Sequence, residues 1–175
     1  MLAALWKSHF AATLQGGKLL AGHLPPHQGH VIQDNGSIAY GGPNPVQLVL
    51  QHPEQAVNPR WKLRKTLTES GGINVSMMDE LGIKEEWLHR FPNELSGGEL
   101  QRICVARAVG PRTRYLIADE MTTMLDAITQ AQIWQALLRW SKQNGVGILV
   151  ISHERRLIER ICSRVVEWAN GAYVR

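Results

Sequence analysis

Short apolar runs and amphipathic segments alternate in the second half of the chain. The runs at 115–118 and 147–152 are almost continuously apolar, which is typical of strands covered on both faces of a sheet. Between them, over about 127–143, apolar residues recur at three- and four-residue intervals and predict a helix. Strands that alternate with helices indicate an α/β fold with a mostly parallel sheet.

Weaker patterns predict further elements on both sides of this region. A strand is expected over 46–50, and a helix around 157–162. Two short helices are expected over 75–91, split near Gly82. The apolar positions that define these two helices are Met77, Met78, Leu81, Trp87, Leu88 and Phe91.

The two ends of the chain carry less information. The stretch up to about Gly42 is poorly patterned, apart from a helix end at 19–22 that two prolines follow. At the other end, the runs 164–168 and 172–174 flank an Asn-Gly turn. We find no internal repeat, and we treat 1–175 as a single domain.

Composition narrows the class of protein only a little. With 44% hydrophobic and 19% charged residues, the 175-residue chain is an ordinary globular domain. A net charge of +4 permits contact with phosphates, but the basic residues are spread over helical faces. Cys104 and Cys162 lie on apolar stripes, so two buried thiols are expected in place of a disulfide. No apolar run approaches the ~18 residues of a membrane span.

A capping-box pattern opens one of the predicted helices. Ser96 stands at the N-cap and Glu99 three residues later, so a helix is expected to run to about Val109. The bare pattern is a helix cap. It is also a candidate anion site, because free backbone N–H groups face outward there, and Gly97 and Gly98 allow close approach. The two interpretations are compatible.

Two acids and a histidine follow the two buried runs. Asp119 and Glu120 come directly after 115–118, and His153 comes directly after 147–152. One carboxylate can hold Mg²⁺ through water while its neighbour orients an attacking water. Helix-terminal acids and a turn histidine are the plainer alternatives. An acid pair and an imidazole at two strand ends, with a capped glycine pair elsewhere, favour a phosphate site.

Five segments, in order along the chain, resemble motifs of the ATP-binding cassette (ABC) family. They are similar to the Q-loop glutamine (Gln51), the ABC signature (95–102), the Walker B strand with its glutamate (115–120), the D-loop (124–126) and the switch-histidine motif (151–153). The continuation from Gln51 to Arg60 has the form used by nickel and oligopeptide importers. The resemblance covers roughly 19–175.

The resemblance implies a fold, cofactors and partners. The fold is a P-loop NTPase-like ABC ATPase domain with a helical subdomain over about 62–109, and the cofactors are ATP and Mg²⁺. The implied partners are a second ABC ATPase subunit and integral-membrane permease subunits at the cytoplasmic face of the membrane, with no nucleic acid.

The resemblance also implies roles for individual residues. Glu120 would be the general base, and His153 would contact the γ-phosphate. Asp119 and Gln51 would support Mg²⁺, and Gln51 would also link it to the transporter. The implied nucleotide-binding residues are Gln51, Ser96, Gly97, Gly98, Glu99, Asp119 and Asp126. The signature serine and glycines would contact a nucleotide that the opposite subunit holds.

One motif of the family is missing. A P-loop reads G-x-x-x-x-G-K-[ST], since consecutive N–H groups and a lysine must wrap the phosphates. Lys7-Ser8 has no glycine before it, and Gly16-Gly17-Lys18 is followed by Leu19 without a hydroxyl. We therefore expect an N-terminally incomplete domain that hydrolyses ATP negligibly by itself.

Several functions remain open at this stage. The first is the ATP-binding subunit of a nickel or peptide importer. The chain is alternatively a truncated or degenerate subunit that lends its signature to a partner with an intact P-loop, or a non-catalytic interaction protein. A third class is the non-transport ABC ATPases that act on nucleic acid. Three histidines within 23–30 could bind Ni²⁺ or Zn²⁺, but two prolines interrupt them, so a polar loop is expected.

Overall fold

The structure is a computed structural model. It describes residues 2–7, 11–33, 36–37, 44–69, 71–169 and 172–174, with the side chains of 16–32, 44–69 and 71–166. The chain forms two compact units. The first unit contains 1–48, 112–120 and 147–175, and the second contains 49–111 and 121–146.

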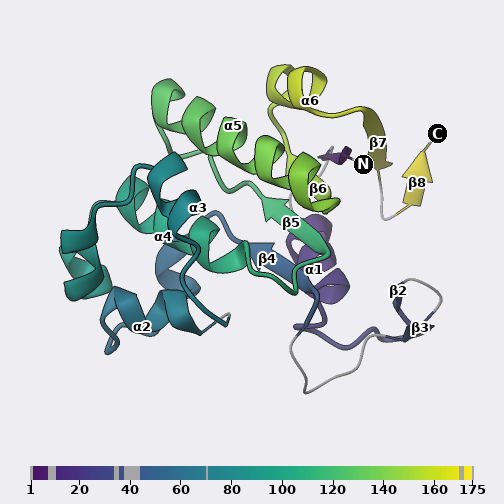
Figure 1. The fold of residues 1–175 in the computed structure, drawn as a ribbon. Helices are drawn as coiled ribbons and strands as arrows, with labels where there is room; N and C mark the ends of the chain where they lie inside the picture. Colours follow the sequence, from purple (N-terminus) through teal and green to yellow (C-terminus); the bar gives the residue numbers. More distant parts are fainter. Residues whose placement is uncertain are drawn as a thin grey trace. The chain divides into compact units, whose positions relative to one another are not determined.

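A six-stranded sheet of mostly parallel strands carries the first unit (Figure 1). Its strands are β4 (Val46–Val49), β5 (Tyr115–Asp119), β6 (Gly147–Ser152), β1 (Leu2–Lys7), β7 (Arg164–Ala169) and β8 (Ala172–Val174), given in their spatial order. Strands β5, β6, β1 and β7 pair in parallel, and β8 pairs antiparallel with β7. Asp119 lies beside Ile151, and Trp6 beside Ser152. The carboxyl ends of β5, β6 and β1 therefore meet at one edge of the sheet, as expected of an α/β fold.

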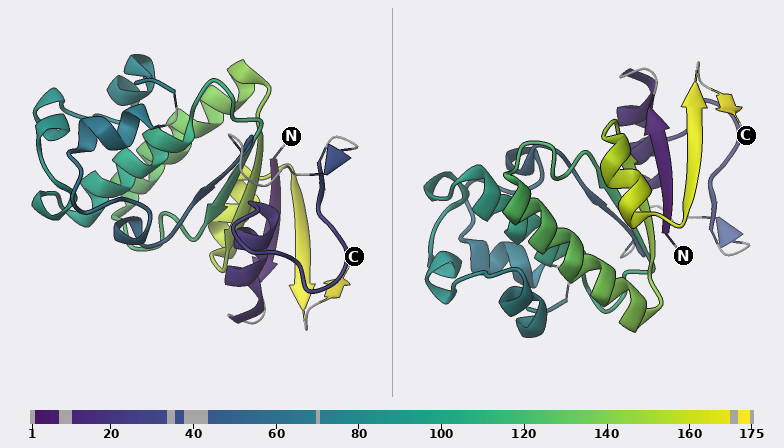
Figure 2. Two further views of the ribbon diagram at one scale, coloured as in Figure 1. Left: turned by 90° about the horizontal axis from the view of Figure 1, so that it is seen from below. Right: turned by 90° about the horizontal axis from the view of Figure 1, so that it is seen from above.

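Strand β1 corrects the expectation of a poorly patterned N-terminal stretch. Residues 2–7 pair in parallel with β6 on one side and β7 on the other, and Figure 2 shows β1 beside β7. Both neighbours lie more than a hundred residues away in the sequence. The hydrogen bonds that fix this strand are therefore non-local, and a local reading of six residues cannot reveal them.

Helices α1 (Ala11–Leu20) and α6 (Arg155–Ile161) complete the first unit, with a short antiparallel pair, β2 (Ile32–Gln33) and β3 (Gly36–Ser37). Helix α1 ends within the predicted 19–22 segment, and Gly22 follows it in the left-handed region with φ of 70°. Further on, the Asn44 side chain accepts from the backbone N–H of Val46 and donates to the carbonyl of Ala21, which fixes the entry to β4. The predicted turn at 170–171 lies outside the described residues.

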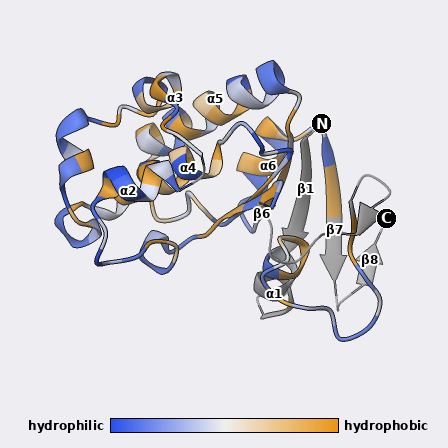
Figure 3. Ribbon diagram, turned by 60° about the horizontal axis from the view of Figure 1, so that its bottom comes forward, coloured by the Kyte–Doolittle hydropathy of each residue, from blue (hydrophilic) through white to orange (hydrophobic). Residues whose placement is uncertain are grey.

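The described part of the second unit is helical. It contains α2 (Leu63–Thr68), α3 (Val75–Glu80), α4 (Gly97–Ala108) and α5 (Ala127–Asn144), with 3₁₀ turns η1 (Pro53–Gln55), η2 (Glu85–His89) and η3 (Pro92–Glu94). Helix α4 begins after Ser96 and ends before Val109, as predicted. Helix α5 ends at Gly145, whose φ of 67° stops it. Figure 3 shows hydrophobic stretches on α2, α4 and α5 between hydrophilic positions.

The core of the second unit matches most of the predicted apolar positions. Met77, Met78, Leu81, Trp87 and Leu88 are all buried. The second expected helix of 75–91 is instead a 3₁₀ turn, η2, and Phe91 lies after it with 38% of its surface exposed. Two residues of the core also bond to each other, because the Trp134 indole N–H donates to the Thr122 hydroxyl at 3.1 Å.

The two cysteines differ in burial. Cys104 on α4 is buried, whereas Cys162 after α6 is only partly covered, so the expectation of two buried thiols is wrong for Cys162. Both thiols are free, as expected. Cys162 is less covered because it follows the last turn of α6, a helix on which Ile158 is the buried residue.

Candidate functional site

In the first unit, three predicted site residues lie at the carboxyl edge of the sheet. Asp119 is the last residue of β5 and is fully buried, and Glu120 follows it with 4% exposure. His153 follows the last residue of β6. The backbone N–H of Glu120 donates to the carbonyl of Ile151 at 2.9 Å, so strand pairing continues one residue beyond β5. The sequence predicted these three side chains at the ends of two strands, and the structure confirms that position.

Glu120 and His153 are in direct contact. Glu120 Oε1 lies 2.8 Å from Nδ1 of His153, and it accepts a second hydrogen bond from the backbone N–H of His153 at 3.0 Å. Because a carboxylate only accepts, the imidazole hydrogen in this contact lies on Nδ1. Half of the His153 side chain is exposed, whereas that of Glu120 is buried. The carboxylate thus fixes the ring while leaving Nε2 for another partner.

The backbone of Glu120 is unusual. Its φ of 52° makes it the single non-glycine residue with positive φ among those that the structure describes. A left-handed conformation costs an L-residue about 1–2 kcal/mol, and such residues cluster at functional sites. The turn brings the carboxylate across to the end of β6. Sequence reasoning missed it, because glutamate carries no signal for this conformation.

Helix α1 packs closely against this edge at Gly17. A Cβ atom built at Gly17 would lie 3.3 Å from Ile151 Cδ1 and 3.5 Å from Asp119 Oδ2. Residues 16–18 belong to the interior of α1, so their backbone is helical and does not form a phosphate loop. The connection from β1 to α1, residues 8–10, lies outside the described residues, and its sequence, Ser-His-Phe, contains no glycine.

The fit of a metal ion to these residues is limited. The buried carboxylate of Asp119 is an oxygen ligand of the kind that Mg²⁺ prefers. The described residues contain no group of three or more His, Cys, Asp or Glu side chains placed to hold a metal ion. Mg²⁺ would therefore need phosphate oxygens as additional ligands.

The second unit carries the capping box of α4. The backbone N–H of Glu99 donates to the Ser96 hydroxyl at 3.3 Å, and Glu99 Oε2 accepts from the backbone N–H of Ser96 at 2.8 Å. The backbone N–H of Ser96 and, second, its hydroxyl act on the Glu99 carboxylate and hold the pKa of Glu99 below its ordinary value, with smaller help from Arg90 and Lys84. Ser96 and Gly97 are exposed, and a Cβ at Gly97 would meet nothing within 4 Å. The first turn of α4 is thus open to a ligand.

The D-loop segment lies against this helix opening. A Cβ at Gly98 would lie 3.6 Å from Leu125 Cδ2, in ordinary contact. The next residue, Asp126, caps α5 by accepting from the backbone N–H groups of Ile128 and Thr129 at 3.0 Å each. The hydrogen bond from the backbone N–H of Thr129 is the largest cause that lowers the pKa of Asp126. Asp126 therefore has a helix-capping role that the sequence interpretation did not include.

Gln51 begins the loop that follows β4, and its side chain is half-buried. The carbonyl before it, that of Leu50, accepts a hydrogen bond from Nε2 of Gln101 on α4 at 3.0 Å. Gln101 is 1% exposed. Gln101 lies within the signature segment, 95–102, but the resemblance implies no role for it. The signal that was available is a polar residue among the apolar positions of α4.

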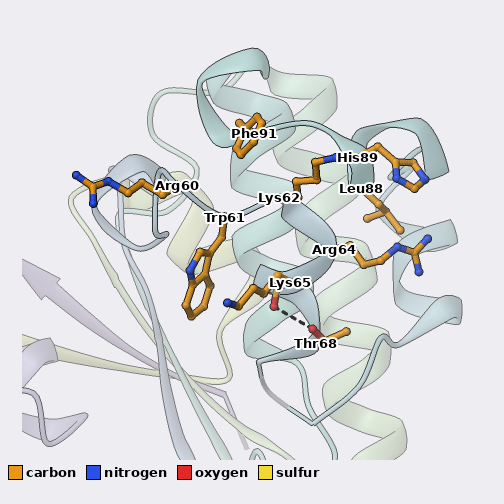
Figure 4. A pocket seen from close by; sticks show the side chains of 9 residues that line it. All are labelled: Arg60, Trp61, Lys62, Arg64, Lys65, Thr68, Leu88, His89 and Phe91. Atoms are coloured by element: carbon orange, nitrogen blue, oxygen red, sulfur yellow. Dashed lines mark hydrogen bonds between the residues drawn. The ribbon is translucent and has the colours of Figure 1, made fainter.

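A shallow cavity of about 630 Å³ opens on the second unit (Figure 4). It is lined by Arg60, Trp61, Lys62, Arg64, Lys65, Thr68, Leu88, His89 and Phe91. Four lysine or arginine side chains and no carboxylate line it. The Lys65 ammonium lies 4.0 Å from the centre of the Trp61 ring, and the Arg64 side chain pairs with Glu85. The cavity thus combines positive charge with the aromatic surfaces of Trp61 and Phe91.

A family profile described as "ABC transporter" matches residues 17–123. Among curated proteins, the nickel import ATP-binding protein NikE of Escherichia coli O157:H7 is 34% identical over 176 residues, covering 90% of this chain and 66% of that protein. NikE of Escherichia coli K12 is 36% identical over 141 residues, covering 74% of this chain and 53% of that protein. The chain spans between half and two thirds of the length of these relatives.

Solved structures share the fold. The dimeric, post-hydrolysis structure of the ATP-binding cassette MJ0796 bound to ADP and Pi has a TM-score of 0.81 at 18% identity, covering all of this chain and 83% of that one. The structure of cbiO1 from Clostridium perfringens, part of the transporter complex cbiONQ, has a TM-score of 0.79 at 19% identity, covering 99% of this chain and 75% of that one. At these identities the likeness concerns the fold alone.

Proposed function

This chain belongs to the ABC transporter family, and we propose that it acts as the ATP-binding subunit of an importer that couples ATP hydrolysis to transport across a membrane. The nickel or di- and oligopeptide class is favoured. Supporting this class are the NikE relatives and the segment from Gln51 to Arg60. The observation that carries the proposal is the contact between Glu120 and His153 beside the buried Asp119.

Each of these side chains has a task in phosphate chemistry. The carboxylate of Glu120 orients and polarises a water for attack on a γ-phosphate. His153, held through Nδ1, has Nε2 free to donate to a phosphate oxygen, which requires that both ring nitrogens carry a hydrogen. Asp119 supports Mg²⁺, which when bound neutralises charge on the phosphates. Because Glu120 already accepts two hydrogen bonds from His153, the acid and the imidazole are oriented before any nucleotide arrives.

A second proposal concerns where ATP binds. Residues 16–18 form helix instead of a phosphate loop, and the printed sequence contains no G-x-x-x-x-G-K-[ST] run, so we infer that the chain does not supply a P-loop of its own. The exposed first turn of α4, with Ser96 and the open Gly97, is intact. We propose that this turn contacts the γ-phosphate of ATP that a second ABC subunit holds in its own P-loop. The chain then contributes to turnover without binding ATP tightly itself.

The membrane subunits are the further partner. No helix in the described ranges has the length and apolar character needed to cross a bilayer. We propose that the permease contacts the cationic cavity around Trp61 and Lys65, because its charge favours a partner segment with acidic and apolar side chains. Such a chain would work at the cytoplasmic face of the membrane. No observation favours nucleic acid as the partner.

One experiment tests the ATPase role and the shared nucleotide site. The chain is mixed with the P-loop-containing ATPase subunit of the same transporter, and ATP turnover is measured with the wild type and with Ser96→Arg. We expect the arginine to block the phosphate contact and to lower turnover about 10²-fold, the effect of losing a preorganised donor. Asn93→Arg adds the same charge on the neighbouring exposed turn and serves as the control. Equal turnover of Ser96→Arg and Asn93→Arg would refute the shared site.

A further inference from the structure

Three side chains of α4 contact three backbone carbonyls of the loop that follows β4. Gln101 Nε2 donates to Leu50 O at 3.0 Å, Cys104 Sγ lies 3.6 Å from Pro53 O, and the Arg107 guanidinium donates to Ala56 O. The donors are three residues apart on the helix, and the acceptors are three residues apart in the loop. Both elements belong to the second unit.

The regular spacing has a physical cause. The loop contains η1, and a 3₁₀ turn has three residues per turn, so the carbonyls of Pro53 and Ala56 lie nearly in line, while Leu50 precedes the turn. On an α-helix, side chains three residues apart are neighbours on one face. The two rows therefore match, and the loop docks along α4 over two turns. Arg107 is anchored further by Glu69, whose carboxylate lies 3.6 Å away.

Gln101 is the member of this row whose chemistry calls for an explanation. It is 1% exposed, and only its amide nitrogen can donate to a carbonyl, so the amide orientation is fixed. Its Oε1 is buried without a hydrogen-bond partner in the described structure. A leucine at this position would bury apolar atoms at no such cost. Because only one end of this buried amide is hydrogen-bonded, we infer that its one hydrogen bond, to Leu50 O, has a function.

The bond from Gln101 joins two parts of the proposed site. Leu50 directly precedes Gln51, and Gln101 lies little more than one helical turn after the Ser96 cap. We propose that Gln101 is a positioning residue that makes the Gln51 loop and the first turn of α4 move as one body. This inference rests on the proposed function for its consequence, since the first turn of α4 is the part that we propose contacts ATP.

Hydrogen exchange in the full chain tests the mechanical part without any nucleotide. The reporters are the amides of Gln55 and Ala56 in the loop, and those of Glu99 and Leu100 in α4, all of which are hydrogen-bonded. Gln101→Leu removes the donor while keeping an apolar fill. We expect exchange at both reporter pairs to rise together by about fivefold, the effect of one net hydrogen bond. A rise at one pair alone, or at neither, would overturn the proposal.

The neighbouring Arg102 offers a matched control. It points to the other side of α4, where it donates to Leu81 O and to the side chains of Thr129 and Gln132. Arg102→Leu removes these bonds from the same helix. We expect it to leave exchange at Gln55 and Ala56 at the wild-type rate. Faster exchange there would mean that any weakening of α4 loosens the loop, and the specific role of Gln101 would fail.

Gln101→Glu provides a rescue that a packing role would not show. A buried glutamate has a raised pKa, and its protonated form can donate to the Leu50 carbonyl, whereas the carboxylate cannot. The ratio of the variant's exchange rate to the wild-type rate at the reporter amides should fall towards one on acidification in Gln101→Glu. In Gln101→Leu this ratio should stay constant. Identical pH profiles of the two variants would show that the donor is not the cause.

Turnover by the mixed pair of subunits then tests the functional part. We expect the ratio of Gln101→Glu to wild-type turnover to recover on acidification together with the exchange ratio. If exchange recovers and turnover is the same in every variant, Gln101 is a packing residue and the inference fails. If the wild-type pair has no turnover at all, the proposed function fails, while the exchange data still decide whether the loop and helix are joined.

Discussion

The carboxylate of Glu120 and the imidazole of His153 form a pair at 2.8 Å, joined again through the backbone N–H of His153. The two residues follow neighbouring parallel strands, β5 and β6, and the buried carboxylate ties their ends together. The Glu120 side chain would therefore fix the position of the proposed general base, which is Glu120 itself, and that of the proposed phosphate contact, His153. A substitution at Glu120 is therefore expected to displace His153 as well.

The first prediction concerns the isolated chain. Because residues 16–18 are helical and no P-loop is present in the sequence, ATP lacks its cradle of donors. The loss of one donor to a developing charge costs about 10²- to 10³-fold in rate, and the loss of a whole loop costs more. We expect purified chain to hydrolyse ATP no faster than Glu120→Gln does, in a phosphate-release assay. Turnover that Glu120→Gln abolishes would contradict this.

The second prediction concerns the positive φ of Glu120. Glu120→Ala and Glu120→Gly both lose the hydrogen bonds to His153, but only glycine relieves the left-handed backbone. We expect the glycine variant to have a free energy of unfolding about 1 kcal/mol above that of the alanine variant, measured by urea denaturation.

A matched pair of variants at Met124 controls for the flexibility of glycine. Met124 is 70% exposed, and its φ is negative. There the order should reverse, with Met124→Gly less stable than Met124→Ala. If alanine is the more stable replacement at both positions, Glu120 carries no strain.

The elements that could be predicted from the sequence carry their own local signals. Helix α4 has the capping box of Ser96 and Glu99, and β5 and β6 are continuous apolar runs. By contrast, β1 is held by strands far away in the sequence, and η2 is a 3₁₀ turn where the apolar spacing predicts an α-helix. Local periodicity does not encode either property.

The candidate site shows the same division. Parallel strands end at one edge, so the sequence predicted that Asp119, Glu120 and His153 lie near one another, and they do. Their hydrogen bond depends on the left-handed turn at Glu120, which no residue type signals. The hydrogen bond from Gln101 to Leu50 O could not be predicted either, because it joins residues 51 positions apart, although Gln101 stands out as a polar residue among the apolar positions of α4. The roles assigned by resemblance remain predictions.

The third prediction uses the two thiols as probes of burial. Burial raises the pKa of Cys104 and that of Cys162 to about 11 each. At pH 8 on the order of 10⁻³ of either thiol is then thiolate, so both should react slowly with a disulfide reagent. We expect the rate for Cys162 to rise about tenfold per pH unit up to pH ~10, while Cys104, being fully buried, reacts only after local opening.

Single variants assign the phases of this reaction. Cys162→Ser should remove the faster phase, and Cys104→Ser should leave it unchanged. The expected order follows from burial, since Cys104 is 2% exposed and Cys162 is only partly covered. A faster phase that survives Cys162→Ser would place the accessible thiol on α4 and contradict the packing of that helix against η1.

The last prediction concerns the cationic cavity and the permease. Within it, Lys65 lies over the ring of Trp61, and no carboxylate lines the surface. Lys65→Glu reverses a charge that we expect to face acidic groups, and Trp61→Ala removes an aromatic anchor. We expect each to weaken binding to the membrane subunits, reconstituted in nanodiscs, by fivefold or more, the effect of losing ~1 kcal/mol at a central contact.

Added salt should reduce the effect of Lys65→Glu and spare that of Trp61→Ala, since only the former is electrostatic. Lys142→Glu makes the same charge change at the exposed end of α5 and is the control. If Lys142→Glu weakens binding as much as Lys65→Glu does, the protein's overall charge, and not this cavity, attracts the permease.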